Sequence, residues 1–240
     1  ALGATIAMML PFGLAFSGLG VIPVAAFCGA LATILLVYNL ARVGKKTPIV
    51  SMLLAGFVVS AMLIAVMSLL IMTNSELNLK LHSIFSFLTG SISVQYWSQL
   101  AVIAPLIIGG IIVALFFAFH LNAFSLGEEQ AAYLGINVER EKILILSLAS
   151  LLTACAVSLS GLIGFVGLVM PHAVRLVLGP DHRLLIPASA VAGATFLVLA
   201  DTLARTLVAP TELPVGIFTA LIGAPFFIYL LRRTRREYAF

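Results

Sequence analysis

Apolar residues fill most of the chain in long runs, and the polar residues are gathered into short stretches between those runs. Window hydropathy separates the runs into eight segments, most of them close to the roughly 20 residues that a helix needs to cross a membrane. The pattern therefore predicts an all-α protein, a polytopic transmembrane helical bundle that forms a single domain. The expected spans are residues 1–16, 21–40, 49–72, 98–119, 143–159, 163–177, 184–207 and 214–231.

The composition agrees with a membrane protein. The chain is 62% hydrophobic and 9% charged, with a mean hydropathy of +1.20, well outside the range of soluble domains. Cys28 and Cys155 lie inside apolar runs, where a cysteine is typically a small packed hydrophobe. The sequence has no phosphate loop, His-Glu-x-x-His or nucleophile-elbow motif, so we expect no enzyme, no metal site and no cofactor. Because Ala1 already lies in an apolar run, we expect the natural N-terminus to lie upstream.

The cations indicate how the spans are oriented, and they do not point to a nucleic-acid partner. Of the 13 Lys and Arg residues, 11 fall in the segments 42–46, 140–142, 175–183 and 232–237. Successive spans alternate sides, and these four segments fall on one side, which the positive-inside rule assigns to the cytoplasm. We therefore expect a cytoplasmic C-terminus, with Lys80 and Arg205 as the cations of the outer side.

Two stretches between spans have helical character of their own. Residues 79–91 place apolar side chains at helical spacing, which predicts an amphipathic helix along the outer membrane surface; a re-entrant loop is the alternative. Residues 122–142 form the longest polar stretch, where Glu128 and Glu129 begin a helix-forming run that Gly135 closes. That short helix would suit contact with a soluble partner, whereas the alternative is a solvated connector.

The segment from 161 to 175 is too short and too broken for a simple lipid anchor. The residues that interrupt it are Gly161, Gly164, Gly167, Pro171 and His172, the last of which is the one histidine we keep as a functional candidate. Irregular backbone at membrane depth survives only where protein or a water-filled cavity covers it, so this span indicates a pathway. Its Gly-to-Pro pattern resembles residues 2–11, as in an inverted repeat, although two such runs can also arise by chance.

One ionisable pair lies inside a predicted span. Asp201 and Arg205 are four residues apart, so they share one helix face and can pair. Pairing offsets part of the cost of a charge at membrane depth, about 2.5–3.5 kcal/mol at the centre. The topology places both residues toward the outer end of their span. Two interpretations remain open: an ion pair that anchors the helix end, or a docking point for an extracytoplasmic partner.

Four ordered motifs carry a family resemblance. They are GLIGFVGLVMPHAVRL at 161–176, DHRLLIP at 181–187, LADTLAR at 199–205 and ELPVGIFTALIGAPFF at 212–227. On these motifs the chain resembles the FecCD family of bacterial ABC importer permeases. The resemblance implies a type II importer permease fold of ten spans, of which the eight seen here would be the third to the tenth. It also implies a location in the bacterial inner membrane, with ABC ATPase subunits, a periplasmic substrate-binding protein and a second permease subunit as partners.

The same resemblance implies roles for particular residues. The run at 126–136 resembles a coupling element that docks into the ATPase, and its residues include Gly127, Glu128, Glu129, Ala131, Leu134 and Gly135. Arg205, with Asp201 as its pair, matches an arginine that receives a carboxylate of the binding protein. The pathway would follow spans 49–72 and 214–231 between two subunits, with a gate at Ile49, Val50 and Ser51. The segment 161–175 would be the eighth span, whose glycines let neighbouring helices approach closely.

The implied function is ATP-driven import of an iron chelate by alternating access, with a siderophore as the first choice and haem or cobalamin as the others. A secondary transporter is the alternative, because it too would show inverted repeats and intramembrane charges, yet it needs no cytoplasmic docking helix. A membrane-embedded enzyme would need clustered acids, histidines or cysteines on facing spans, and the sequence offers none.

Overall fold

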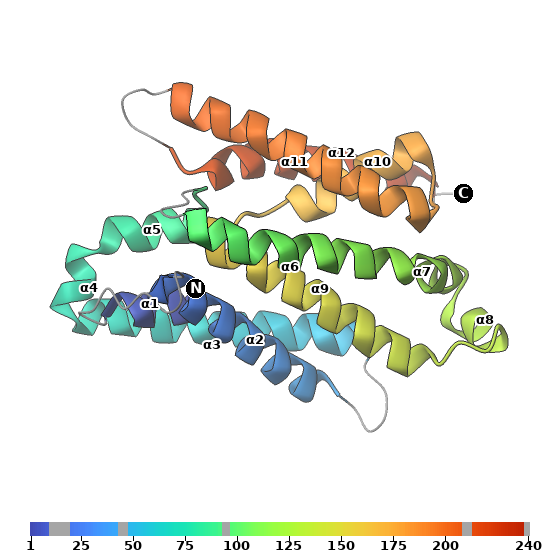
Figure 1. The fold of residues 1–240 in the computed structure, drawn as a ribbon, viewed down its shortest axis with the longest axis horizontal. Coiled ribbons are helices and arrows are strands. Elements are labelled where there is room, and N and C mark those ends of the chain that lie inside the picture. Colours follow the sequence, from blue (N-terminus) through green and yellow to red (C-terminus); the bar gives the residue numbers. More distant parts are fainter. Residues whose placement is uncertain (10–19, 43–47, 93–96, 208–212, 238–240) are drawn as a thin grey trace.

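The computed structural model describes residues 1–9, 20–42, 48–92, 97–207 and 213–237, and over these ranges the chain forms twelve helices and no strand. The helices are α1 (Leu2–Met9), α2 (Val21–Ala41), α3 (Ile49–Thr73), α4 (Ser75–Leu79), α5 (Leu81–Thr89), α6 (Trp97–Phe116), α7 (Ala118–Ser125), α8 (Glu128–Tyr133), α9 (Val138–Ser160), α10 (Val166–Leu178), α11 (His182–Thr206) and α12 (Val215–Glu237). Figure 1 shows the long helices side by side along the longest axis, with α4 at one end and α8 at the other. The all-α prediction is confirmed.

Five of the described helices are long and apolar enough to cross a membrane: α2, α3, α6, α9 and α11. The 13-residue α10 and the Val215–Leu230 part of α12 are apolar but shorter. The first predicted span, 1–16, is represented by α1, because residues 10–16 lie outside the described residues. The number of crossings, eight, therefore stays a prediction.

Several helix boundaries differ from the hydropathy pattern, and two of these differences lie beside the polar stretch 122–142. The helix expected at 98–119 ends as α6 at Phe116, and a turn leads directly into α7. The helix expected from 143 begins at Val138, where Asn137 caps it by accepting a hydrogen bond from the backbone N–H of Arg140 at 3.2 Å. Hydropathy detects apolar composition, whereas a capped helix can continue through charged residues at its end.

The amphipathic stretch expected at 79–91 is divided between two helices. Asn74 caps the short α4, accepting from Glu76 and Leu77, and the chain bends at Lys80 into α5. On α5 the side chain of Ile84 is 3% exposed and that of Phe85 is 60% exposed. That this segment is an amphipathic helix along the outer membrane surface stays a prediction. Ile84 packs in a small core with Met8 and Leu77.

Close approaches between helices occur where glycine leaves room. A Cβ at Gly3 of α1 would overlap the Ala25 carbonyl oxygen of α2, and one at Gly29 would lie 3.2 Å from the Gly3 Cα. The first half of the proposed internal repeat is therefore a tight helix crossing.

Many hydroxyl side chains bond back to their own helix. The hydroxyls of Thr33, Ser68, Thr73, Thr153, Thr195 and Thr202 each donate to the carbonyl oxygen four residues earlier, at 2.7–2.9 Å. This arrangement satisfies a polar group within an apolar environment without help from a neighbouring helix. Side-chain bonds between segments lie elsewhere, as with Lys80, whose Nζ donates to the Met8 carbonyl at the C-terminal end of α1 at 2.6 Å.

Candidate functional site

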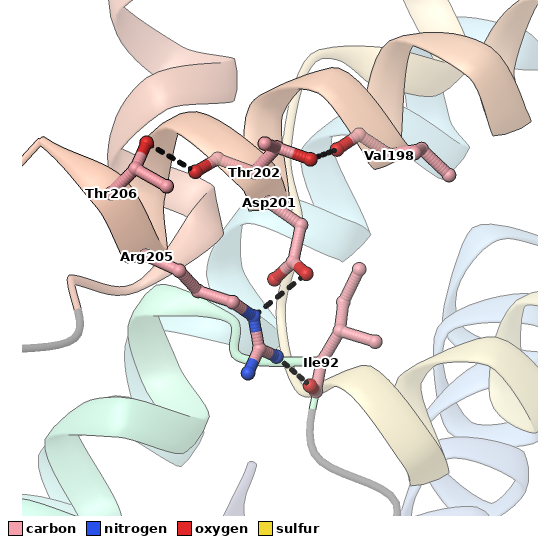
Figure 2. A network of polar contacts seen from close by, with 6 residues as sticks. All are labelled: Ile92, Val198, Asp201, Thr202, Arg205 and Thr206. Atoms are coloured by element: carbon pink, nitrogen blue, oxygen red, sulfur yellow. Dashed lines mark hydrogen bonds and ion pairs between the residues drawn. The ribbon is translucent and has the colours of Figure 1, made fainter.

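The ion pair of α11 is present and is anchored on a second segment. Arg205 Nε donates to Asp201 Oδ2 at 2.8 Å, and Arg205 Nη2 donates to the backbone carbonyl of Ile92, also at 2.8 Å (Figure 2). The two side chains are 43% and 25% exposed, respectively. The nearby hydroxyls of Thr202 and Thr206 donate to carbonyls of α11 itself. The guanidinium is therefore held in place by a carboxylate and a carbonyl while part of it stays accessible.

The broken segment after α9 forms a junction with the ends of α5 and α12. Backbone N–H groups of Leu162 and Gly216 donate to the carbonyls of Phe87 and Gly90 at 3.0 and 3.4 Å, and Ser91 N–H donates to Ser160 at 2.9 Å. We call this the glycine junction, because three of its positions accept only glycine. Its glycines are Gly90 (φ 77°), Gly161 (φ 65°) and Gly216.

The steric reason is clear at two of these positions. A Cβ at Gly161 would overlap the Phe87 carbonyl, and a Cβ at Gly216 would overlap the Thr89 carbonyl. The prediction that glycine allows close packing is thus confirmed at Gly161. At Gly164 and Gly167 a Cβ would meet no atom of the described residues of this chain within 4 Å, so the described packing does not require glycine there.

Pro171 lies inside α10 and does not end the helix. It is the sixth residue of α10, which continues to Leu178. Pro171 removes one backbone hydrogen bond near the start of α10, a loss that membrane helices tolerate. His172 stacks edge-on against Phe226 of α12, with ring centroids 6.5 Å apart, so it contributes to packing between α10 and α12.

One residue of this segment has an unusual backbone. Phe165 precedes α10 with φ 68°, which is uncommon outside glycine. Its side chain lies against Gly223 of α12, where a Cβ would overlap the Phe165 Cβ. Phe165 could not be singled out from the sequence, because a positive φ has no signature in a phenylalanine.

The predicted coupling element is a capped helix. Glu128 and Glu129 lie in the first turn of α8, and its C-terminal end is a Schellman motif in which Gly135 (φ 82°) donates to Ala132 and Ile136 donates to Ala131. Gly127 precedes the helix at φ 116°. The local prediction of a short helix that Gly135 closes is confirmed.

One face of α8 is buried against the rest of the chain, and the other is exposed. Ala131 is fully buried, so it supports the helix from inside. Tyr133 is 89% exposed and Leu134 is 60% exposed. Lys142 of α9 pairs with Glu128 at 2.6 Å, which ties the start of α8 to the following helix. Tyr133 was missed by the sequence analysis, although a tyrosine in a short polar helix between two glycines is a detectable signal.

The expected gate residues begin α3. Val50 is 76% exposed and Ser51 is partly buried, and the side chain of Ile49 lies outside the described part of the structure. Along α3, apolar residues such as Leu53, Phe57 and Met62 are also more than half exposed. This helix therefore presents an extended apolar face outward from the chain.

The predicted site residues fall at opposite ends of the bundle. Arg205 and the glycine junction lie at the end that also holds α5, whereas α8 lies at the other end, with the C-terminal end of α10 (Figure 1). Among the described residues, no three His, Cys, Asp or Glu side chains come close enough to hold a metal ion. The arrangement offers two separate surfaces joined by long helices and no chemical centre within the described ranges.

Comparison with known proteins places this helical membrane fold in a class. A solved structure, a metal-chelate-type ABC transporter in an inward-facing conformation, superposes with a TM-score of 0.82 at 31% identity, covering 97% of this chain and 72% of that one. The FecCD transport family matches residues 1–233. The chain belongs to the FecCD transport family.

Relatives that are named for a transported compound share much of this sequence. The cobalamin import permease BtuC of Halobacterium salinarum is 46% identical over 97% of this chain and 60% of its own length. The hemin transport permease HmuU of Yersinia pestis is 42% identical over 89% and 63%. The Fe(3+) dicitrate permease FecD of Escherichia coli is 37% identical over 90% and 66%. The chain thus spans about three fifths of the length of the curated relatives it matches.

Proposed function

We propose that this chain belongs to the membrane-spanning permease subunit of an ATP-driven importer that carries a metal chelate into the cytoplasm by alternating access. Its relatives are named for the transport of cobalamin, hemin and ferric dicitrate, which supports the chelate class. Within that class we propose an iron–siderophore first. The ligand of the binding protein that docks on this subunit decides between siderophore, haem and cobalamin.

The observation that carries the proposal is the exposed end of α8. A helix of six residues with a glycine on each side, and with Tyr133 and Leu134 pointing outward, offers an apolar contact on a fixed support. Aromatic side chains that protrude in this way are typical anchors of protein interfaces. We propose that α8 docks into the ATPase, with Glu128 and Glu129 at its start and Leu134 at its end.

The other proposed partners follow from the remaining surfaces. Arg205, held by Asp201, would receive a carboxylate of the periplasmic binding protein. The exposed apolar face of α3 would meet a second permease subunit, identical or paralogous, across the pathway, with Ile49, Val50 and Ser51 near its inner mouth. This orientation puts α8 and the C-terminus in the cytoplasm of a bacterial cell, in agreement with the distribution of the cations.

A substitution on α8 tests the proposal. Tyr133→Ala is expected to weaken association with the ATPase by about tenfold or more. An exposed aromatic side chain that becomes buried at an interface typically carries a large share of the binding energy. The measurement is co-purification of the ATPase with the permease and their titrated affinity in detergent. Phe116→Ala is the matched control, since it removes an aromatic side chain that is 76% exposed on α6. Equal ATPase affinity in both variants would contradict the docking role.

Uptake by proteoliposomes separates the importer from a secondary transporter. A catalytically dead ATPase is expected to stop chelate uptake while the permease stays assembled. Uptake that continues under an ion gradient without ATP hydrolysis would favour the secondary transporter instead.

A further inference from the structure

A polar cluster joins α7 to the start of α11 near the end of the bundle that holds α8. Asn122 Nδ2 donates to Asp181 Oδ1 at 2.7 Å. Asn122 Oδ1 accepts from the backbone N–H of His182 at 2.9 Å and lies 2.6 Å from His182 Nδ1. We call these three residues the Asn122 clasp. It connects positions 59 and 60 residues apart in the sequence.

The chemistry of the clasp fixes the orientation of its amide. The backbone N–H of His182 can only donate, so the Asn122 oxygen must face it, and the amide nitrogen must face the Asp181 carboxylate. The Asn122 oxygen can only accept, so the His182 Nδ1 that lies beside it must carry a proton and donate it. One side chain therefore makes three mutually consistent contacts with α11 and its capping residue.

Asp181 takes part both in the clasp and in the N-terminal cap of α11. Its Oδ1 also accepts from Arg183 N–H at 3.0 Å, which caps α11. The Asn122 amide, and then the Arg183 N–H, hold the pKa of Asp181 below its usual value. Asp181 is therefore an anion at neutral pH, and any second carboxylate at position 122 would be repelled.

The positions of the two joined helices give the clasp its significance. Asn122 lies in α7, which passes through Leu126 and Gly127 directly into α8. His182 begins α11, which continues without interruption to the turn that carries Asp201 and Arg205. A helix of 25 residues is about 37 Å long at 1.5 Å per residue. The clasp thus links the helix leading into the proposed ATPase contact with the far end of the helix that holds the proposed docking arginine.

We propose that Asn122 is a positioning residue that couples displacement of α8 to α11, so that docking at Arg205 and ATP hydrolysis influence each other through the clasp. This inference rests on the proposed importer function. Apolar packing between α7 and α11 permits sliding of one helix along the other, whereas three contacts to one amide fix their register. Hydrogen-bond networks between elements of this kind can carry energetic coupling between distant sites.

A swap of the two clasp residues tests the connection. Asn122→Asp places a carboxylate against Asp181, and is expected to lower stimulation of ATPase activity by the binding protein about fivefold or more. Asp181→Asn alone keeps an acceptor for Asn122 and for Arg183, and asparagine is also a good helix cap. The double variant Asn122→Asp/Asp181→Asn removes the repulsion between two carboxylates and lets an amide at 181 donate to the carboxylate at 122, but that amide nitrogen cannot accept from Arg183 N–H as Asp181 Oδ1 does. The double variant is therefore expected to restore part of the stimulation.

The measured quantity is the ratio of stimulated to basal ATPase activity in the complete importer, reconstituted with its ATPase and its binding protein. Ser125→Ala is the matched control, because the Ser125 hydroxyl donates only within α7, to the Asn122 carbonyl at 2.6 Å. Its ratio is expected to stay unchanged. If Asn122→Asp does not assemble, Asn122→Ser removes the same contacts without adding charge and is expected to show the same loss.

The outcomes separate this inference from the proposed function. A normal ratio in Asn122→Asp or Asn122→Ser, or a double variant no better than Asn122→Asp, overturns the coupling role. If the wild-type chain binds neither an ATPase nor a binding protein, the importer function itself fails. A structural defect would instead lower basal and stimulated activity together with assembly, and so leave the ratio unchanged.

Discussion

Replacing Gly216 by alanine is expected to cause the largest loss of stability of any single methyl addition in the described helices. Alanine normally stabilises a helix relative to glycine by about 0.5–1 kcal/mol. At Gly216, however, the new Cβ would overlap the Thr89 carbonyl. Val215 and Thr219 beside it are 2% and 0% exposed, so α12 has little room to move away. Overpacking typically costs about 1–3 kcal/mol, and we expect the overlap with a backbone carbonyl to place Gly216→Ala at the upper end of that range.

The measurement is the thermal unfolding midpoint of the purified permease in detergent, together with its yield as a monodisperse species. Gly109→Ala on α6 is the matched control, because a Cβ there would meet nothing within 4 Å. We expect Gly109→Ala to match or exceed the wild-type midpoint. If Gly216→Ala unfolds at the same temperature as the control, the glycine junction is not a rigid contact.

Reversing the charge at Arg205 is expected to abolish docking of the binding protein. Arg205→Glu would present a carboxylate where we propose that the partner also has one, and like charges across an interface cost several kcal/mol. The affinity, measured by surface plasmon resonance on permease in nanodiscs, should fall by at least about a hundredfold, since about 1.4 kcal/mol is a factor of ten. ATPase assembly should remain, because α8 lies at the other end of the bundle.

The contacts of Arg205 determine which controls are needed. Arg205→Glu also loses the bond to Ile92 and sets two carboxylates on one face of α11. Asp201→Asn keeps an acceptor for Arg205 Nε and keeps the cation, so docking should persist. Arg205→Gln removes the charge without repulsion and should give an intermediate affinity. Normal docking by Arg205→Glu would contradict the proposal that Arg205 receives the binding protein.

Much of the fold could be predicted from the sequence, because a segment that crosses lipid must be apolar and must satisfy its own backbone hydrogen bonds. The spans expected at 21–40, 49–72 and 184–207 correspond to α2, α3 and α11 within two residues at each end. Apolar runs of this length satisfy their backbone only as helices in a membrane. The hydropathy pattern did not predict that α9 begins at Val138. The charged first turn of α9 is stabilised by a local cap, which hydropathy does not detect.

The site was predictable where its determinants are local. The acids at the start of α8 and the glycine at its end act within a few residues, so the short helix followed from the sequence. The Asn122 clasp depends on residues about 60 positions apart, and no spacing rule connects them. The Asp181 cap before α11 was the one signal available.

The back-bonded hydroxyls of α3 have a consequence for any molecule that moves along this helix. Ser68 and Thr73 give their hydrogens to the carbonyls of Ile64 and Leu69, so their remaining capacity is to accept. Chelates of ferric iron present mainly oxygen acceptors, and such oxygens would find no donor at these two hydroxyls. On the proposed pathway, these two hydroxyls of α3 would therefore do little to hold such a cargo. The selection of cargo would then rest with the partner that delivers it.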